Sequence, residues 1–214
     1  MNGLTKIVVL GESGVGKTSF VNALCKNFST QLDSTVGAHI SILWHDYRAG
    51  LSSQRAEMIE VWDIDGSSAH RSASTVFLDG TCGIVLVHDL SNRKSESNLG
   101  QWLAIINGDR RNTNIHTLNT LMADIERTQI PIIIVGTRLD QAPHRGNMQS
   151  LSFSGAPQVN IDCRKDISAG SSQAMVISRF LDAVIERAKG PIESIRRKVI
   201  HSPISHHPVH HPQS

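Results

Sequence analysis

Aromatic residues are scarce in this chain of 214 residues, at 4% of the sequence. Surfaces that bind single-stranded nucleic acids stack bases on aromatic side chains, so this scarcity argues against such a surface. Neither sign of charge dominates, since the formal net charge is +2 at pH 7. A phosphate backbone or an anionic membrane is bound by a strongly positive surface, which so balanced a chain lacks. We therefore expect no nucleic-acid partner.

Cysteine is rare as well, with Cys25, Cys82 and Cys163 lying far apart. An odd number of widely spaced cysteines forms neither a disulfide framework nor a cysteine metal site, and is typical of reduced thiols in the cytosol. No stretch of the sequence reaches the roughly 18 apolar residues of a membrane-spanning helix. The apolar segment that follows Met1 is too short for a secretory signal. These absences predict a cytoplasmic protein.

Short β-branched runs alternate with segments of helical periodicity in the rest of the chain. The expected strands cover residues 6–10, 38–46, 55–64, 83–89, 130–135 and 159–163, and the expected helices cover residues 18–27, 95–106 and 174–188. A turn through Gly50 joins the second and third strands into a hairpin. This order predicts an α/β fold with a mostly parallel six-stranded sheet, one antiparallel edge strand and helices on both faces.

Two regions interrupt this pattern. Residues 108–129 mix polar residues with a helical patch over 118–126, and we interpret them as an insertion. After a single domain over residues 1–188, the chain becomes rich in His and Pro, which predicts a disordered tail over residues 189–214. The tail histidines could bind a transition metal, although a solvated low-complexity tail is the simpler interpretation. The tryptophans, Trp44, Trp62 and Trp102, are expected to be packing residues.

The segment GESGVGKT, residues 11–18, carries the strongest chemical signal. It fits G-x-x-x-x-G-K-[ST] in full and lies between an expected strand and an expected helix, which is the context that a phosphate-binding loop needs. Backbone N–H groups of Gly14, Val15 and Gly16 can point at phosphate oxygens, helped by the partial positive charge of the helix N-terminus. Lys17 can reach the β- and γ-phosphates, and the Thr18 hydroxyl can bind Mg²⁺.

A second motif, GTRLD at residues 136–140, follows a core strand and therefore lies at the carboxyl edge of the sheet, beside the phosphate loop. The Asp140 carboxylate can accept hydrogen bonds from N1–H and N2–H₂ of guanine, an edge that adenine lacks. Arg138 can lay its stem and its guanidinium plane over the base, and Leu139 lies between these two residues. Taken alone, the segment also fits a surface loop in which Asp140 caps a helix.

Further polar residues lie at the same edge of the sheet. Asp63 ends a strand and can hold Mg²⁺ through a water molecule. Gly66 can bring its N–H group onto a γ-phosphate because no side chain intervenes. Thr35, in the loop before the second strand, offers a hydroxyl that could complete the Mg²⁺ shell. Each feature is common by itself, but in this order after a phosphate loop they reinforce one another.

These residues together resemble the Ras-like small GTPases, over nearly all of residues 4–188. Thr35-Val36-Gly37 as switch I, residues 62–66 as switch II and residues 137–140 as the guanine motif follow the phosphate loop in family order. The stretches at 87–90, 135–141 and 161–172 are similar to the Rab-like protein 3 subgroup. The resemblance implies the P-loop NTPase fold of a small GTPase, GTP or GDP with Mg²⁺ as ligands, and protein effectors or regulators as partners.

The resemblance also assigns roles to single residues. Lys17, Thr35 and Gly66 take the catalytic positions; Thr18, Thr35 and Asp63 take the metal positions; residues 14–19, including Ser19, and Arg138, Leu139 and Asp140 take nucleotide-binding positions. Asp162 and Cys163 stand where other small GTPases contact guanine through backbone N–H groups. Members of the subgroup are linked to self-association, hence a homodimer, and to chaperoning of prenylated small GTPases.

The sequence departs from the family pattern in ways that affect hydrolysis and anchoring. Ser67 stands where most of the family has the Gln that orients the attacking water, and serine is too short for that role. Asp65 replaces a small residue, and its charge repels a γ-phosphate unless it is neutralised. Arg138 stands in place of Lys, which keeps the charge but alters the geometry. No cysteine lies near the C-terminus, so we expect no lipid anchor.

We therefore predict a guanine-nucleotide-binding switch that hydrolyses GTP slowly or with the help of a partner. The alternative is a scaffold that stays loaded with GTP and acts through protein contacts, which Ser67 and Asp65 favour. A third interpretation, an ATP-using P-loop kinase, is disfavoured by the guanine motif and by the lack of an Arg-rich lid.

Overall fold

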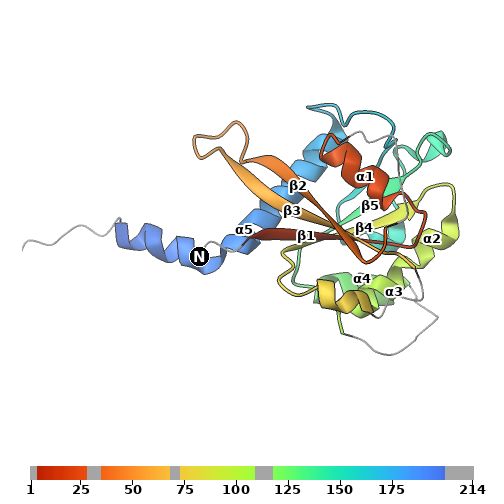
Figure 1. Cartoon of the computed structure of the whole chain (residues 1–214), viewed down its shortest axis with the longest axis horizontal. Coiled ribbons are helices and arrows are strands. Elements are labelled where there is room, and N and C mark those ends of the chain that lie inside the picture. Colours follow the sequence, from red (N-terminus) through yellow and green to blue (C-terminus); the bar gives the residue numbers. More distant parts are fainter. Residues whose placement is uncertain (1–3, 28–34, 68–72, 109–117, 201–214) are drawn as a thin grey trace, which may run out of the picture.

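The computed structural model describes residues 4–27, 35–67, 73–108 and 118–200, and its centre is a six-stranded sheet (Figure 1). The strands are β1 (Thr5–Leu10), β2 (Ala38–Tyr47), β3 (Arg55–Ile64), β4 (Gly83–Asp89), β5 (Ile132–Thr137) and β6 (Gln158–Asn160). They are ordered β2-β3-β1-β4-β5-β6. β2 and β3 pair antiparallel, and the other neighbouring pairs are parallel. The expected sheet with one antiparallel edge strand is confirmed.

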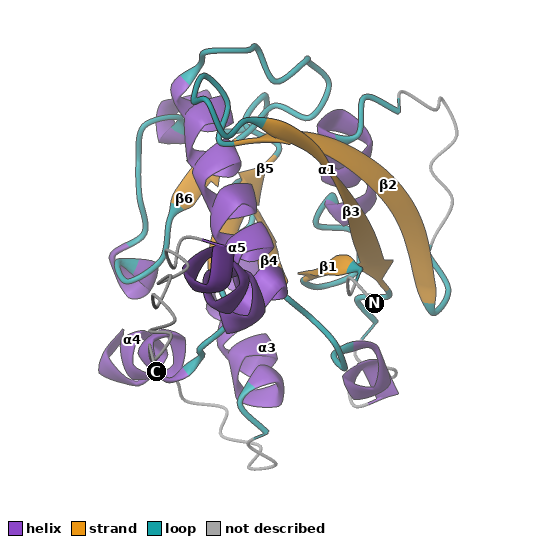
Figure 2. Ribbon diagram, turned by 90° about the vertical axis from the view of Figure 1, so that its left-hand side faces the viewer, coloured by secondary structure: helices purple, strands orange, loops and turns teal. Residues whose placement is uncertain are grey.

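Helices cover both faces of this sheet (Figure 2). The helices on one face are α1 (Lys17–Leu24) and α5 (Ser172–Ile200), and those on the other are α3 (Leu99–Ile106) and α4 (Leu118–Arg127). Successive side chains of a strand point to opposite faces. In β1, Ile7 and Val9 therefore join the core under α1 and α5, whereas Val8 and Leu10 join the core under α3 and α4. Burial on both faces explains why the central strands are continuous apolar runs.

The helix boundaries differ from expectation at several places, and α1, for example, ends at Leu24 rather than at residue 27. The helix expected over 95–106 is divided at Asn98 into α2 (Arg93–Ser97) and α3. The Asn92 side chain accepts a hydrogen bond from the Lys94 backbone N at 3.1 Å, so α2 begins earlier than expected. α5 is assigned to Ile200, but Gly190 has non-helical dihedral angles (φ 45°, ψ −167°) that mark a kink between two helices, so the first of them ends close to the expected residue 188. Residues 191–200, beyond this kink, are helical, and residues 201–214 lie outside the described residues, so the disordered tail expected over 189–214 stays a prediction.

The outer parallel strands also differ in their bounds. β5 begins at Ile132, directly after Pro131, rather than at residue 130. β6 ends at Asn160 rather than at residue 163, because the chain turns there: the Lys165 backbone N donates to the Asp162 backbone O at 3.1 Å. The helical patch expected over 118–126 is confirmed as α4. The segment over 109–117 lies outside the described residues.

Strand β2 exposes the more apolar of its two faces. Ile40, Ile42 and Trp44 alternate like residues of a buried face, yet they are 47%, 45% and 67% exposed. Their side chains project on the α3 side of the sheet, where the core includes Ile64 at the end of β3 but none of these three residues. The expectation that Trp44 is a packing residue is therefore wrong.

The opposite face of β2 is buried although it is mixed in character. His45 Nε2 lies 2.8 Å from Asp182 Oδ1, and the Tyr47 hydroxyl donates to Glu186 Oε1 at 3.0 Å. Both carboxylates belong to α5, which packs on this face. Because the buried polar atoms find partners there, the mixed face can be covered without leaving a hydrogen-bonding group unsatisfied.

Two tryptophans give a matched test of this packing. Trp102 in α3 is 1% exposed, whereas Trp44 is 67% exposed. Trp102→Ala is expected to lower the free energy of unfolding by about 3–5 kcal/mol through lost burial and a residual cavity. Trp44→Ala is expected to change it by no more than about 0.5 kcal/mol. Urea denaturation followed by circular dichroism measures both, and equal losses in the two variants would contradict this assignment of the core.

Candidate nucleotide site

The phosphate loop connects β1 to α1 and has the backbone that the motif requires. Gly14 and Gly16 have φ of 76° and 93°, in the left-handed region that side chains rarely adopt. Lys17, the first residue of α1, is buried, and its ammonium group donates to the carbonyls of Gly11 at 3.1 Å and Glu12 at 2.8 Å. Burial lowers the pKa of Lys17. The loop therefore holds a buried cation at the start of a helix, where an anion is favoured.

The three predicted metal ligands meet beside this lysine. The Thr18 hydroxyl donates to Asp63 Oδ2 at 2.5 Å, the Thr35 hydroxyl donates to the same oxygen at 3.3 Å, and the two hydroxyls are 3.3 Å apart. Asp63 is fully buried at the end of β3, and burial raises its pKa. Among the described residues, no group hydrogen bonds to Asp63 Oδ1. Two hydroxyls and a carboxylate with a spare oxygen are a hard oxygen set, which fits Mg²⁺.

The segment after β3 lies against the phosphate loop. The Ser13 backbone N donates to the Gly66 carbonyl at 3.0 Å. A Cβ atom on Gly66 would overlap the Lys17 ammonium and the backbone of Gly11 and Glu12, so only glycine fits this approach. The fold therefore places Gly66 directly beside the Lys17 ammonium group, and its predicted contact with a γ-phosphate stays a prediction.

Asp65 and Ser67 form a local turn that sequence reasoning missed. The Asp65 carboxylate accepts from the Ser67 backbone N at 2.9 Å and from the Ser67 hydroxyl at 3.0 Å. The Asp65 backbone N donates to the Gly37 carbonyl at 2.8 Å, which connects the two switch segments. An Asp followed by Ser at the second position is the signal that could have predicted this turn. The Ser67 hydroxyl is engaged by Asp65.

The guanine motif is anchored to the phosphate loop. The Thr137 hydroxyl donates to the backbone carbonyls of Val15 and of His88, the latter at 3.1 Å. Arg138 Nη2 donates to the Gly14 carbonyl at 2.6 Å. Arg138 Nη1 lies 3.2 Å from Asp89 Oδ2. The Arg138 guanidinium is thus engaged by protein groups, and its predicted place over a base stays a prediction.

The loop after β6 completes this edge of the site. The Leu139 backbone N donates to the Ile161 carbonyl at 3.3 Å, so the guanine motif and the 161–165 loop are side by side. Arg164, which sequence reasoning missed, lies 3.2 Å from Asp140 and hydrogen bonds to Asp162. Its position directly after Asp162 and Cys163 could have indicated it. These contacts bring one guanidinium to the carboxylates of Asp140 and Asp162, although only Asp140 was predicted to act through its carboxylate.

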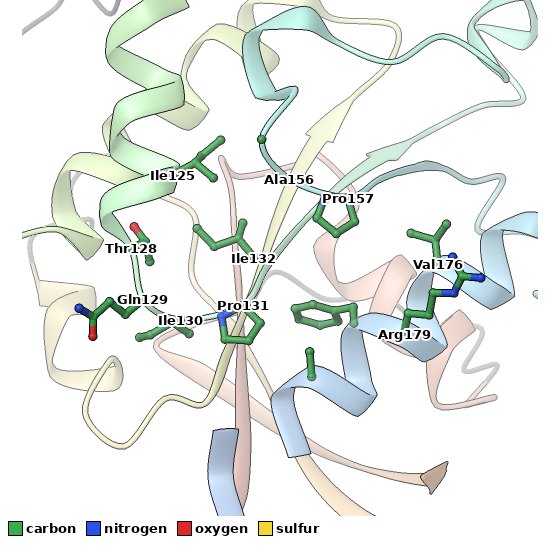
Figure 3. Close-up of a pocket in the computed structure, with 13 residues that line it drawn as sticks. Ile125, Thr128, Gln129, Ile130, Pro131, Ile132, Ala156, Pro157, Val176 and Arg179 are labelled. Carbon is green, nitrogen blue, oxygen red and sulfur yellow. The ribbon is translucent and has the colours of Figure 1, made fainter. Parts of the chain in front are cut away.

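A concave region of about 600 Å³ lies elsewhere, at the start of β5 rather than at its end (Figure 3). Figure 3 shows Ile125, Ile132 and Pro157 around it, with Arg179 of α5 at one side. The nucleotide site follows the carboxyl end of the same strand, at Thr137. This groove is therefore separate from the phosphate loop.

Within the described ranges, no helix has both the length and the apolar character needed to cross a membrane.

A phosphate-loop motif beside two hydroxyls and a buried carboxylate, with Asp140 following β5 at the same edge of the sheet, is the arrangement of a P-loop nucleotide-binding protein of the GTPase kind. A family model described as Roc, the Ras of Complex domain of DAPkinase, matches residues 6–120. Rab-like protein 3 of Xenopus tropicalis is 39% identical over 202 residues, covering 85% of either chain. The human Rab-like protein 3 is 37% identical, covering 85% of this chain and 84% of its own.

A more distant relative is the small GTPase LIP1 of Arabidopsis thaliana, which is 26% identical over 69% of this chain and 45% of its own length. The chain belongs to the Ras-like small GTPases, a family of GTP-binding regulatory switches, and within them to the Rab-like protein 3 group. The small-GTPase fold and the family predicted from the motifs are confirmed.

Proposed function

We propose that this chain alternates between GTP- and GDP-bound states with Mg²⁺ and hydrolyses GTP slowly. The observation that carries the proposal is the convergence of Thr18, Thr35 and Asp63 beside Lys17. Thr18 and Thr35 would bind Mg²⁺ directly and Asp63 through water, and the ion would neutralise phosphate charge. Lys17 and the loop N–H groups stabilise charge on the transferring phosphoryl group.

Slow hydrolysis follows from the residue after Gly66. The water that attacks the γ-phosphate is oriented by a side chain at this position in fast members of the class. Ser67 is short, and its hydroxyl already donates to Asp65 at 3.0 Å. The Asp65 carboxylate adds a negative charge near the bound phosphates. Both features favour a long-lived GTP state or a partner that supplies the missing group.

Protein partners are favoured by the uncovered strip on β2. Ile40, Ile42 and Trp44, together with Met58 of β3, expose apolar side chains between the two switch segments. Exposed apolar patches of this kind mark protein contacts. In the β2–β3 register Ile40 is the residue of this strip nearest to Thr35 and Gly66, so an effector that covers Ile40 and the adjoining loops would have an affinity that depends on the nucleotide.

The second candidate function is a GTP-loaded scaffold with little hydrolysis. The Ser67–Asp65 contact and the exposed strip favour it, and the resemblance adds a homodimer and assistance to prenylated small GTPases. Both candidates bind guanine nucleotide, so one experiment tests what they share. Mass spectrometry of the nucleotide released from purified protein is expected to find GTP and GDP. ATP in that sample would refute the guanine assignment for both.

Ser67→Gln separates the two candidates. Glutamine is longer than serine, so its amide can extend past Asp65 toward the attacking water. One added hydrogen bond to that water is expected to speed single-turnover GTP cleavage about tenfold. Quenched-flow measurement with radiolabelled GTP gives the rate. Ser67→Ala is the control, because it removes the hydroxyl without adding reach and leaves cleavage slow. If Ser67→Gln cleaves GTP no faster than the wild type, the scaffold becomes the better explanation.

A further inference from the structure

The Arg164 guanidinium contacts two carboxylates in the predicted base-binding region, those of Asp162 and Asp140. Its Nε and Nη2 atoms donate to Asp162 Oδ1 at 3.0 Å and Oδ2 at 3.1 Å, which is a bidentate pair. Its Nη1 atom, on the remaining side of the guanidinium, lies 3.2 Å from Asp140 Oδ2. The two carboxylates are largely buried, with side chains 16% and 10% exposed, whereas the Arg164 side chain is 67% exposed. A single exposed cation thus spans two buried anions.

The two carboxylates would repel each other without this cation. Cys163 lies between Asp162 and Arg164 in the chain, and burial together with the charges of Asp162 and Asp140 raises the pKa of its thiol to about 12. The negative charges of Asp162 and Asp140 therefore both affect the Cys163 thiol, which indicates that the two carboxylates lie close together. Like charges placed close together in a partly desolvated site destabilise it unless a counter-charge lies between them.

We propose that Arg164 is a positioning residue for base recognition, which clamps the 161–165 loop onto the guanine motif and holds the Asp140 carboxylate for the base. The inference rests on the proposed function, because it assigns Asp140 to the guanine edge. Arg164 acts through Asp140 and Asp162 rather than by touching the nucleotide. Loss of the clamp lets the loop separate from Leu139, so nucleotide release becomes faster.

Arginine is needed because the contact uses three nitrogens in one plane. Lysine at this position offers one ammonium group, which can bind one carboxylate at a time. The ion pairs of Arg164 with Asp140 and Asp162 are also sensitive to salt, because Arg164 is mostly exposed and added ions screen exposed ion pairs. Release of nucleotide from the wild type is therefore expected to accelerate with ionic strength through this contact.

Release of GDP labelled with a methylanthraniloyl group tests the clamp by stopped-flow fluorescence. Arg164→Ala is expected to release it about fivefold faster than the wild type at low salt, with a smaller difference at high salt. Arg164→Lys is expected to fall between them. Lys165→Ala is the matched control, because Lys165 carries the same charge on the same loop, is 78% exposed, and contacts only Asp162, at 3.4 Å, among the described carboxylates. It is expected to change release less than about twofold.

The pKa of Asp162, measured without nucleotide, tests the same Arg164 contact. The hydrogen bond from Arg164 lowers the pKa of Asp162 from 3.8 to about 2. The contact therefore stabilises the fold above pH 3.8, and this contribution is lost as the pH falls toward about 2. In Arg164→Ala, carboxyl carbon NMR titration is expected to find the pKa of Asp162 raised relative to the wild type.

The possible results distinguish a failure of the Arg164 clamp from a failure of the proposed guanine-nucleotide binding. Equal release from Arg164→Ala and Lys165→Ala, with wild-type GDP binding intact, overturns the clamp alone. Slower release from Arg164→Ala also overturns it, because the guanidinium would then compete with guanine for Asp140. A wild-type protein that binds no labelled GDP refutes the proposed function and the clamp together. Faster release that shrinks with salt, together with the raised pKa of Asp162, supports the clamp.

Discussion

Replacing Asp140 with Asn is expected to change which base the protein prefers. In the proposed site the Asp140 carboxylate would accept hydrogen bonds from both donors on the guanine edge, whereas an Asn side chain has one acceptor and one donor group. Xanthine carries an oxygen where guanine carries its amino group, so the Asn amide can donate to it. A site that leaves a buried polar group unpaired rejects a ligand strongly, so the GTP-to-XTP affinity ratio is expected to fall about a thousandfold.

Competition of GTP and XTP against a fluorescent nucleotide measures this ratio. Asp162→Asn is the control, since it removes a carboxylate from the same edge and disturbs the same Arg164 contact. Asp162→Asn is expected to weaken both nucleotides while keeping the preference for GTP. If Asp140→Asn still prefers GTP, Asp140 does not read the base, and the alternative assignment of Asp140 as a helix cap gains support.

Much of this site could be predicted because its parts are local in the sequence. A phosphate loop is a short motif with a required context, and the order of Thr35, Asp63 and Asp140 along the chain follows the strands that place them. Parallel strands bring their carboxyl ends to one edge of the sheet. The fold therefore brings Thr18, Thr35 and Asp63 within hydrogen-bonding distance although 45 residues separate the first and last of them in sequence.

The parts that could not be predicted depend on side chains far apart in the chain. The pairing of Arg164 with Asp140, and that of Arg138 with Asp89, requires knowing how three loops meet. No pattern within one segment contains that information. The sequence identifies the charged residues, but the tertiary fold determines which of them form ion pairs.

Strand β2 shows the same limit for packing. An alternation of period two identifies a strand and its two faces, but it does not say which face is covered. The more apolar face, with Ile42 and Trp44, is exposed because no described helix lies over it. The mixed face is buried because α5 offers Asp182 and Glu186 to its polar atoms. The exposed apolar face is then consistent with a partner that is bound in one nucleotide state.

Lys17→Met is expected to lower the affinity for GTP and GDP roughly a thousandfold. Methionine keeps the apolar stem in its buried position but removes the only cation that the phosphate loop itself contributes. Breaking a buried charge contact costs about 3–5 kcal/mol, and about 1.4 kcal/mol corresponds to tenfold in affinity. Isothermal titration calorimetry measures the loss. Lys94→Met, on the exposed surface of α2, is the control and is expected to bind as the wild type does.

The thermal stability of Lys17→Met distinguishes lost binding from lost folding. Burial of the ammonium group lowers the pKa of Lys17, which means that the fold disfavours the charge that the ligand needs. Nucleotide-free Lys17→Met is therefore expected to unfold at a temperature no lower than nucleotide-free wild type. Added GDP at a hundred times the wild-type dissociation constant stabilises the wild type by about 2.7 kcal/mol, and this stabilisation is expected to vanish in the variant. A variant that is still stabilised by GDP would mean that the loop N–H groups hold the phosphates without Lys17.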